Sequence, residues 1–124
     1  MEYESLKGWK YRITKKFSLR TNVKPAKAIR TNFSTLNTAG RLYIHKGFCW
    51  DGASGARDTK NIMRGSCIHD CFCNWYSKGL ITDEMRGQAD DLFYKLIKKD
   101  GMSDLRAGYI IKAVKANTKI RYGI

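Results

Sequence analysis

Two helix-forming segments joined by a short glycine turn constrain this chain more than any other feature. The first runs from about residue 59 to residue 76 and the second from about residue 83 to residue 99, and both repeat apolar side chains at helical spacing. Asp58 or Thr59 can cap the first segment, and Gly79 ends it. A link of about five residues makes consecutive helices antiparallel neighbours, so we expect a helical hairpin.

The register of this hairpin brings His69 level with Asp90. His69 lies eight residues before Ser77, and Asp90 lies eight residues after Thr82. At about 1.5 Å per residue, both positions are roughly 12 Å from the turn, so we expect their side chains to touch. A carboxylate bonded to one imidazole nitrogen leaves the other nitrogen as a base, which predicts a catalytic pair. The alternative is that the pair only satisfies its own polar groups in the core.

Asp70 is expected to point beside this pair, toward the loop of residues 50–55, because one helical step turns it by about 100°. Gly52 and Gly55 make that loop turn-forming, and such loops expose backbone carbonyls. A carboxylate beside carbonyl oxygens can hold calcium, which would stabilise an oxyanion. The predicted metal ligands are therefore Asp70, Gly52 and Gly55. The residues expected to support the site are Asp51, Ser54, Arg57 and Arg86.

The remaining sequence predicts an α+β fold. Residues 9–13 alternate aromatic or aliphatic with basic side chains, which is typical of a half-buried strand, and Phe17 and Leu19 continue it after a break. Residues 21–40 are expected to form mostly loop, with room for a short strand, and residues 41–49 another strand. A third helix follows Ser103 and carries Leu105, Tyr109, Ile110 and Val114. We therefore expect a small N-terminal antiparallel sheet and a three-helix C-terminal half in a single domain, residues 1–124.

Positive charge is concentrated in the N-terminal half. The net charge is +13, and residues 1–50 hold 11 Lys and Arg against two acidic residues, which gives +9. Such a surface attracts nucleic acid, anionic lipid or an acidic protein, although a solvated basic face is the simpler interpretation. We expect no transmembrane segment, because no stretch approaches the ~20 apolar residues that a membrane span needs. The polar start of the chain predicts no signal peptide.

Three of the four cysteines, Cys67, Cys71 and Cys73, fall within seven residues on the first predicted helix. This spacing is poor for a disulfide framework, so we expect reduced thiols. His69 and Cys73 are four residues apart and share a helix face, which leaves zinc as an alternative, but two ligands do not make a zinc site.

An ordered set of motifs resembles a family of short tailed-phage and prophage proteins, domain of unknown function 1353. The motifs are GFCWDGASG at 47–55, DTKN at 58–61, MR at 63–64, IHD at 68–70, Arg86, AD at 89–90, Phe93, DGM at 100–102 and RA at 106–107. The resemblance covers roughly residues 9 to 123. It implies a bacteriophage gene product, found in the host cytoplasm or carried in the virion, and no particular activity.

A shorter resemblance concerns mechanism. His69 and Asp70, followed by ADDLF at residues 89–93, resemble the active helices of phospholipase A2, including the form in parvovirus capsids. It implies that His69 activates water, that Asp90 orients His69, and that Asp70 binds calcium with carbonyls of Gly52 and Gly55. Cys73 stands where that family usually has a tyrosine, and the loop lacks a close Gly-x-Gly.

The hypothesis is a phage lipid or ester hydrolase that uses His69, Asp70 and Asp90. The first alternative is a non-catalytic virion or assembly protein in which the same residues only stabilise the fold. The second is a basic nucleic-acid-binding protein, although the sequence contains no recognisable reading module.

Overall fold

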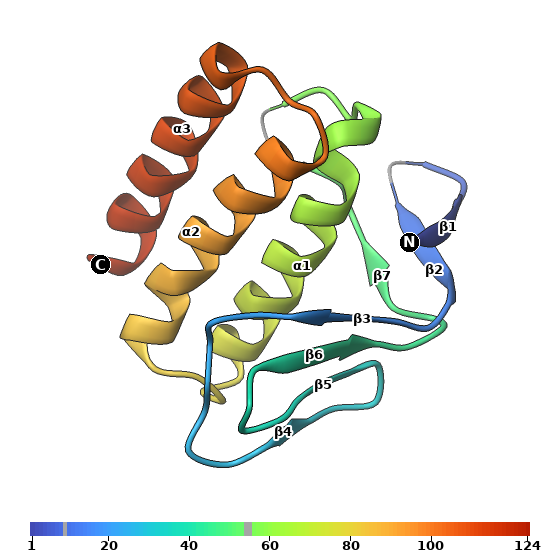
Figure 1. Ribbon diagram of the computed structural model, residues 1–124, viewed down its shortest axis with the longest axis vertical. Coiled ribbons are helices and arrows are strands. Elements are labelled where there is room, and N and C mark those ends of the chain that lie inside the picture. Colours follow the sequence, from blue (N-terminus) through green and yellow to red (C-terminus); the bar gives the residue numbers. More distant parts are fainter. Residues whose placement is uncertain (9, 54–55) are drawn as a thin grey trace. The chain divides into compact units, whose positions relative to one another are not determined.

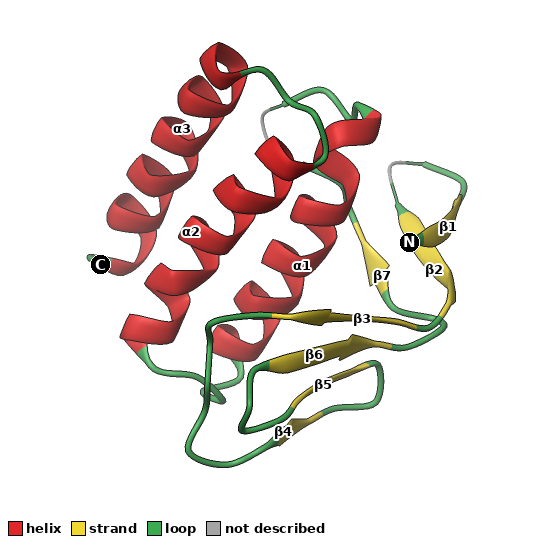
Figure 2. Cartoon of the chain, in the orientation of Figure 1, coloured by secondary structure: helices red, strands yellow, loops and turns green. Residues whose placement is uncertain are grey.

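Strands occupy the first part of the chain and helices the second (Figures 1 and 2). The computed structural model describes residues 1–8, 10–53 and 56–124. Residues 1–52 and residues 53–124 form two compact units, which are described separately below. The predicted α+β class is confirmed, with antiparallel strands followed by three helices. The single domain stays a prediction.

The strand unit contains two antiparallel sheets. Their strand orders are β1-β2-β7 and β3-β6-β5-β4. Lys16 alone separates β2 from β3, so the chain leaves the first sheet and enters the second at the predicted break. The strands are β1 (Glu2–Ser5), β2 (Tyr11–Lys15), β3 (Phe17–Arg20), β4 (Ile29–Arg30), β5 (Ser34–Leu36), β6 (Arg41–Ile44) and β7 (Cys49–Trp50). Trp9, expected to start a strand, lies outside the described residues.

The strand predicted over residues 41–49 is wrong in its extent, because it divides into β6 and β7. A turn separates them, in which the Phe48 amide donates to the carbonyl of His45. Gly47 makes this turn possible with a φ of +98°, which side-chain-bearing residues rarely adopt. A Cβ at Gly47 would also lie 2.9 Å from the ring of Phe33. Buried apolar side chains from both sheets fill this unit: Ile13, Val23, Ile29, Leu36, Leu42, Ile44, Phe48 and Trp50.

The helical unit contains α1 (Lys60–Ser77), α2 (Asp83–Lys99) and α3 (Asp104–Tyr122). The predicted antiparallel hairpin is confirmed for α1 and α2. Arg64 near the start of α1 pairs with Asp100 at the end of α2, with 2.8 Å between Nη2 and Oδ1. At the other end of the hairpin, the Tyr76 hydroxyl donates to Asp83 over 2.7 Å. Contacts at both ends fix the relative register of the two helices.

The helix boundaries follow from local chemistry. Gly79 has a φ of +71°, and the amide of Leu80 then donates back to the carbonyl of Trp75, which closes α1. The hydroxyl of Thr82 accepts from the Met85 amide and caps α2. Thr59 occupies the N-cap position of α1, but its side chain does not bond the backbone there. Its hydroxyl instead donates to Asn61 over 2.6 Å.

Helix α3 buries a few side chains and leaves two of its large apolar ones exposed. Ala107, Ile110 and Thr118 are buried, whereas Leu105 is 88% and Tyr109 is 77% exposed. Lys115 pairs with Asp91 over 2.9 Å, which ties α3 to α2 at the surface. None of the helices described here is long and apolar enough to cross a membrane.

Close approach of α1 to α2 depends on Gly65. A Cβ added at Gly65 would lie 2.9 Å from Cγ2 of Ile97 and 3.2 Å from the ring of Phe93. Both neighbours are buried, so neither can move aside into solvent. Gly65 therefore lets the two backbones come near enough for side chains on facing turns to meet.

We expect Gly65→Ala to destabilise the protein by about 1–3 kcal/mol, because the methyl group overpacks the hairpin. Gly87→Ala is the matched control, since it lies in α2 with no atom within 4 Å of an added Cβ. This control should gain about 0.5–1 kcal/mol from helix propensity. Urea unfolding of both variants measures the difference, and equal stabilisation by both substitutions would contradict the close packing.

Candidate functional site

His69 of α1 and Asp90 of α2 touch across the hairpin, as the register predicts. Nε2 of His69 lies 2.6 Å from Oδ1 of Asp90. The Asp90 side chain is only 4% exposed and the His69 side chain 17%. An ionised carboxylate can only accept hydrogen bonds, so Nε2 carries the proton that it donates to Asp90. The other ring nitrogen, Nδ1, is therefore the one that remains for proton transfer.

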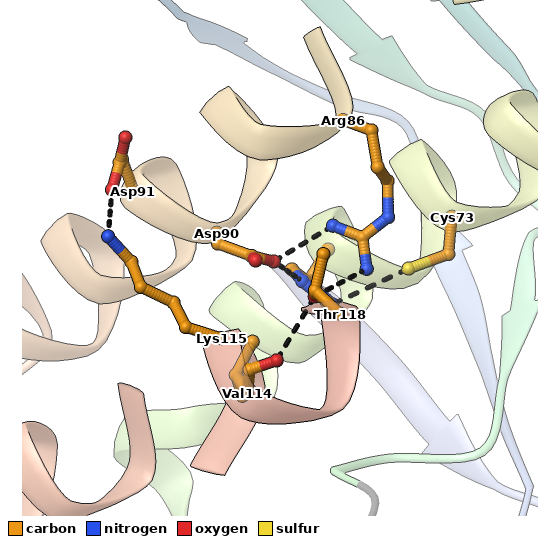
Figure 3. A network of polar contacts seen from close by, with 8 residues as sticks. Cys73, Arg86, Asp90, Asp91, Val114, Lys115 and Thr118 are labelled. Atoms are coloured by element: carbon orange, nitrogen blue, oxygen red, sulfur yellow. Dashed lines mark hydrogen bonds and ion pairs between the residues drawn. The ribbon is translucent and has the colours of Figure 1, made fainter. Parts of the chain in front are cut away.

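The same carboxylate oxygen also accepts from a buried arginine. Arg86 lies one turn before Asp90 on α2 and donates from Nη1 to Oδ1 over 2.8 Å. Its Nη2 donates to the hydroxyl of Thr118 on α3 over 3.2 Å, and Thr118 donates onward to the carbonyl of Val114. Figure 3 shows the Arg86 guanidinium between Asp90 and Thr118. One chain of polar contacts thus joins all three helices.

Arg86 is otherwise enclosed by the helical unit. It is 2% exposed, and its Nε is buried without a hydrogen-bond partner among the described residues. Its guanidinium carbon lies 5.4 Å from the ring centre of Tyr122, within the range of a cation–π contact. Asp90 is therefore the counter-charge that makes burial of this arginine tolerable.

Cys73 faces the second nitrogen of the imidazole. Its Sγ lies 3.7 Å from Nδ1 of His69, one helical turn away on α1. The Cys73 side chain is half-buried, and the ring of Phe93 covers the imidazole from α2 at 5.3 Å between ring centres. Asp90, His69 and Cys73 therefore form a row in which the imidazole contacts an acid on one side and a thiol on the other.

These contacts change the acid–base behaviour of the row. Burial lowers the pKa of His69, but the hydrogen bonds to Asp90 and Cys73 outweigh it and raise that pKa to about 9. Burial raises the pKa of Asp90, and the hydrogen bonds from His69 and Arg86 overcome this effect and hold the pKa below its ordinary value. Asp90 is thus an anion and His69 largely a cation at neutral pH.

The expected calcium ligands do not form a described site. Asp70 is exposed on α1, Gly55 lies outside the described residues, and Gly52 belongs to the strand unit. Across residues 1–8, 10–53 and 56–124, no group of three or more His, Cys, Asp or Glu side chains is arranged to hold a metal ion. Calcium binding stays a prediction, and we derive no catalytic step through a metal.

Of the residues expected to support the site, Arg86 contacts the pair through Asp90. Ser54 lies outside the described residues, and Asp51 is exposed in the strand unit. Arg57 is exposed, and its carbonyl accepts a hydrogen bond from Arg106 over 3.3 Å.

Sequence reasoning missed two members of the network. Thr118 has no sequence signal, because its contact depends on how α3 packs against α2. Cys73 does have one, since its spacing of four residues from His69 places both on one helix face. That spacing suggested only a zinc ligand, whereas the structure places the thiol against the imidazole.

Comparisons with known proteins found no relatives. No protein-family model matches the sequence, and neither the curated proteins nor the solved structures include a significant match. The assignment of a function therefore rests on the geometry of the site and on the resemblances carried by its motifs.

Protonation of His69 should make stability depend on pH. Because the pKa is about 9 in the folded protein and 6.5 in its ordinary state, the stabilisation is complete below pH 6.5 and is lost as the pH rises through 9. The free energy of unfolding should fall in this window with a slope approaching about 1.4 kcal/mol per pH unit.

Urea unfolding between pH 6 and pH 10 measures this slope. His69→Asn should flatten it, whereas His45→Asn, which changes the only other histidine, should leave it intact. An equal slope in wild type and His69→Asn would show that His69 does not titrate as described.

Proposed function

We propose that this chain is a phage hydrolase that cleaves carboxylic esters, with lipid esters as the first candidate substrates. The observation that carries the proposal is the 2.6 Å contact between His69 and Asp90. It fixes the imidazole with Nε2 protonated and turns Nδ1 away from the acid. The local resemblance to the helices of phospholipase A2 supports the same assignment.

In this mechanism His69 moves the proton and Asp90 positions it. Nδ1 exchanges a proton with the attacking group and with the leaving alcohol, while Asp90 stabilises the imidazolium form of His69, which predominates at neutral pH. Arg86 holds Asp90 in place through Oδ1 and does not reach Nδ1. The protein would act in the cytoplasm of the infected cell or as part of the virion.

A non-catalytic virion or assembly protein is the second candidate. The observation that favours it is the burial of Arg86, Asp90 and Thr118, each 3% exposed or less. A buried polar network of this kind stabilises the packing of the helices whether or not a reaction takes place at His69. The two candidates make different predictions for a substitution that removes the base and keeps the shape.

We expect the wild-type protein to hydrolyse a p-nitrophenyl ester or phosphatidylglycerol vesicles, assayed at pH 7 and pH 9 with and without calcium. His69→Asn should lower the rate by about 10²–10⁴-fold, the usual contribution of a general base. His45→Asn is the matched control and should keep the rate, because His45 bonds Thr35 in the strand unit.

Equal rates in wild type and His69→Asn, or no hydrolysis of either substrate by the wild type, would contradict the hydrolase. If phage assembly is unaffected by His69→Asn and requires Arg86 and Asp90, the structural candidate is favoured instead.

The basic strand unit is proposed to hold the protein on an anionic lipid surface. We expect retention on phosphatidylglycerol vesicles at low salt that is lost as salt rises, because a field of this kind is screened within ~10 Å at 0.1 M salt. Replacing Lys24, Lys27 and Arg30, all exposed, with Glu should abolish retention. The control is the same charge change in the helical unit, at Lys95, Lys99 and Lys112, which should weaken retention on the vesicles less.

Vesicle co-sedimentation and DNA gel shifts measure the two classes of partner. Tight retention on DNA with none on vesicles would replace the lipid proposal with a nucleic-acid partner. If the protein is retained on neither vesicles nor DNA at low salt, the positive charge of the strand unit serves solubility only.

A further inference from the structure

Cys73 differs from the other three cysteines in its surroundings. Cys67 and Cys71 are fully buried in α1, and burial raises the pKa of Cys67 far above its ordinary value. Cys49 is exposed in the strand unit, with its Sγ 3.4 Å from the carbonyl oxygen of Gly47. Cys73 is half-buried, and its Sγ lies 3.7 Å from the Nδ1 of an imidazole whose other nitrogen bonds a buried acid.

The order thiol, imidazole, carboxylate is the arrangement that activates a sulfur nucleophile. The acid fixes the imidazole, and the imidazole exchanges a proton with the sulfur. A protonated imidazole beside sulfur also stabilises the thiolate, which is the form that attacks carbonyl carbon. A side chain that can be the attacking group in the proposed hydrolysis, Cys73, therefore lies next to Nδ1 of His69.

We propose that Cys73 is the nucleophile of this site and that the acyl group of the substrate passes through a thioester on its sulfur. This inference rests on the proposed hydrolase and specifies which group attacks the ester. Asp90 and Arg86 contribute indirectly, because they hold the imidazole against Cys73.

The step balances with water as the only second reactant. The Cys73 thiolate attacks the ester carbonyl, the bond to the alcohol breaks, and the leaving alkoxide takes its proton from Nδ1 of His69. Water then attacks the thioester while neutral His69 accepts its proton, and the bond between the acyl carbon and the Cys73 sulfur breaks. The products are a carboxylic acid and the thiolate–imidazolium pair with which the cycle began.

The geometry of His69 also suits a thiol nucleophile, because Nε2 is taken up by Asp90 at 2.6 Å and Nδ1 faces the Cys73 sulfur at 3.7 Å. Among the described residues, the imidazole contacts Cys73 of α1 and Asp90 of α2. Asp90 also accepts from Arg86, and Arg86 in turn donates to the neutral Thr118 of α3.

Alkylation by iodoacetamide at pH 7, read residue by residue by peptide mass spectrometry, tests this nucleophile without any substrate. Exposure alone predicts that Cys49 reacts first. The proposal predicts that Cys73 reacts about tenfold faster than Cys49 or more, because an ordinary thiol is only a few per cent thiolate at that pH. His69→Asn should remove the advantage of Cys73 and leave the rate of Cys49 unchanged.

Cys49 reacting faster than Cys73 in the wild type, or an unchanged Cys73 rate in His69→Asn, would overturn the inference. Circular dichroism of His69→Asn is recorded alongside. If that variant unfolds, the comparison of Cys73 with Cys49 in the wild type still decides.

Ester hydrolysis by Cys73→Ala separates this inference from the proposed function. Loss of hydrolysis in both Cys73→Ala and His69→Asn, with retention in Cys49→Ala, supports the nucleophile. An acyl group found on Cys73 of the wild type after mixing with p-nitrophenyl acetate supports it further. If hydrolysis is lost in His69→Asn and kept in Cys73→Ala, Cys73 is not the nucleophile. The proposed hydrolase then still holds, with water as the nucleophile.

Discussion

A carboxylate buried among helices must be paired, and Asp90 is paired twice through one oxygen. Oδ1 accepts from Nε2 of His69 and from Nη1 of Arg86, and the side chains of Asp90 and Arg86 are each 4% exposed or less. Removing Asp90 from this set leaves the charge of Arg86 uncompensated in the interior, which costs about 3–5 kcal/mol. Helices α1, α2 and α3 are therefore bound to the relative positions that keep these contacts, because Arg86 also reaches Thr118.

The interactions that stabilise the fold also set the chemistry. Asp90 stabilises the positive charge of the imidazole and fixes which ring nitrogen faces Cys73. A cationic His69 suits a thiolate partner, so the structural and catalytic roles favour the same protonation state. The network need not loosen for the site to act, since only Cys73 and the edge of the imidazole must meet a substrate.

The hairpin and the His69–Asp90 contact could be predicted from sequence, because helix rise and a short glycine turn leave only one register for antiparallel neighbours. The division of the strand unit could not, since it depends on a turn at Gly47, whose positive φ and closeness to the ring of Phe33 leave no room for a side chain. The exposure of Leu105 and Tyr109 could not be predicted either, because α3 carries apolar residues on opposite sides and the sequence does not indicate which side packs. In the structure the side with Ala107 is buried. Contacts of Thr118 with Arg86 depend on that same choice.

A double-mutant cycle between Arg86 and Asp90, measured by urea unfolding at pH 7, tests the role of this pair most directly. Asp90→Leu leaves the charge of Arg86 buried without its partner and should cost about 3–5 kcal/mol. Arg86→Met leaves Asp90 paired with His69 alone and should also destabilise the protein, by less than Asp90→Leu. The double variant leaves neither charge in the core and should cost far less than the two single effects together. Two small single effects, or effects that simply add, would contradict the claim that this buried pair holds the helices and the site in place.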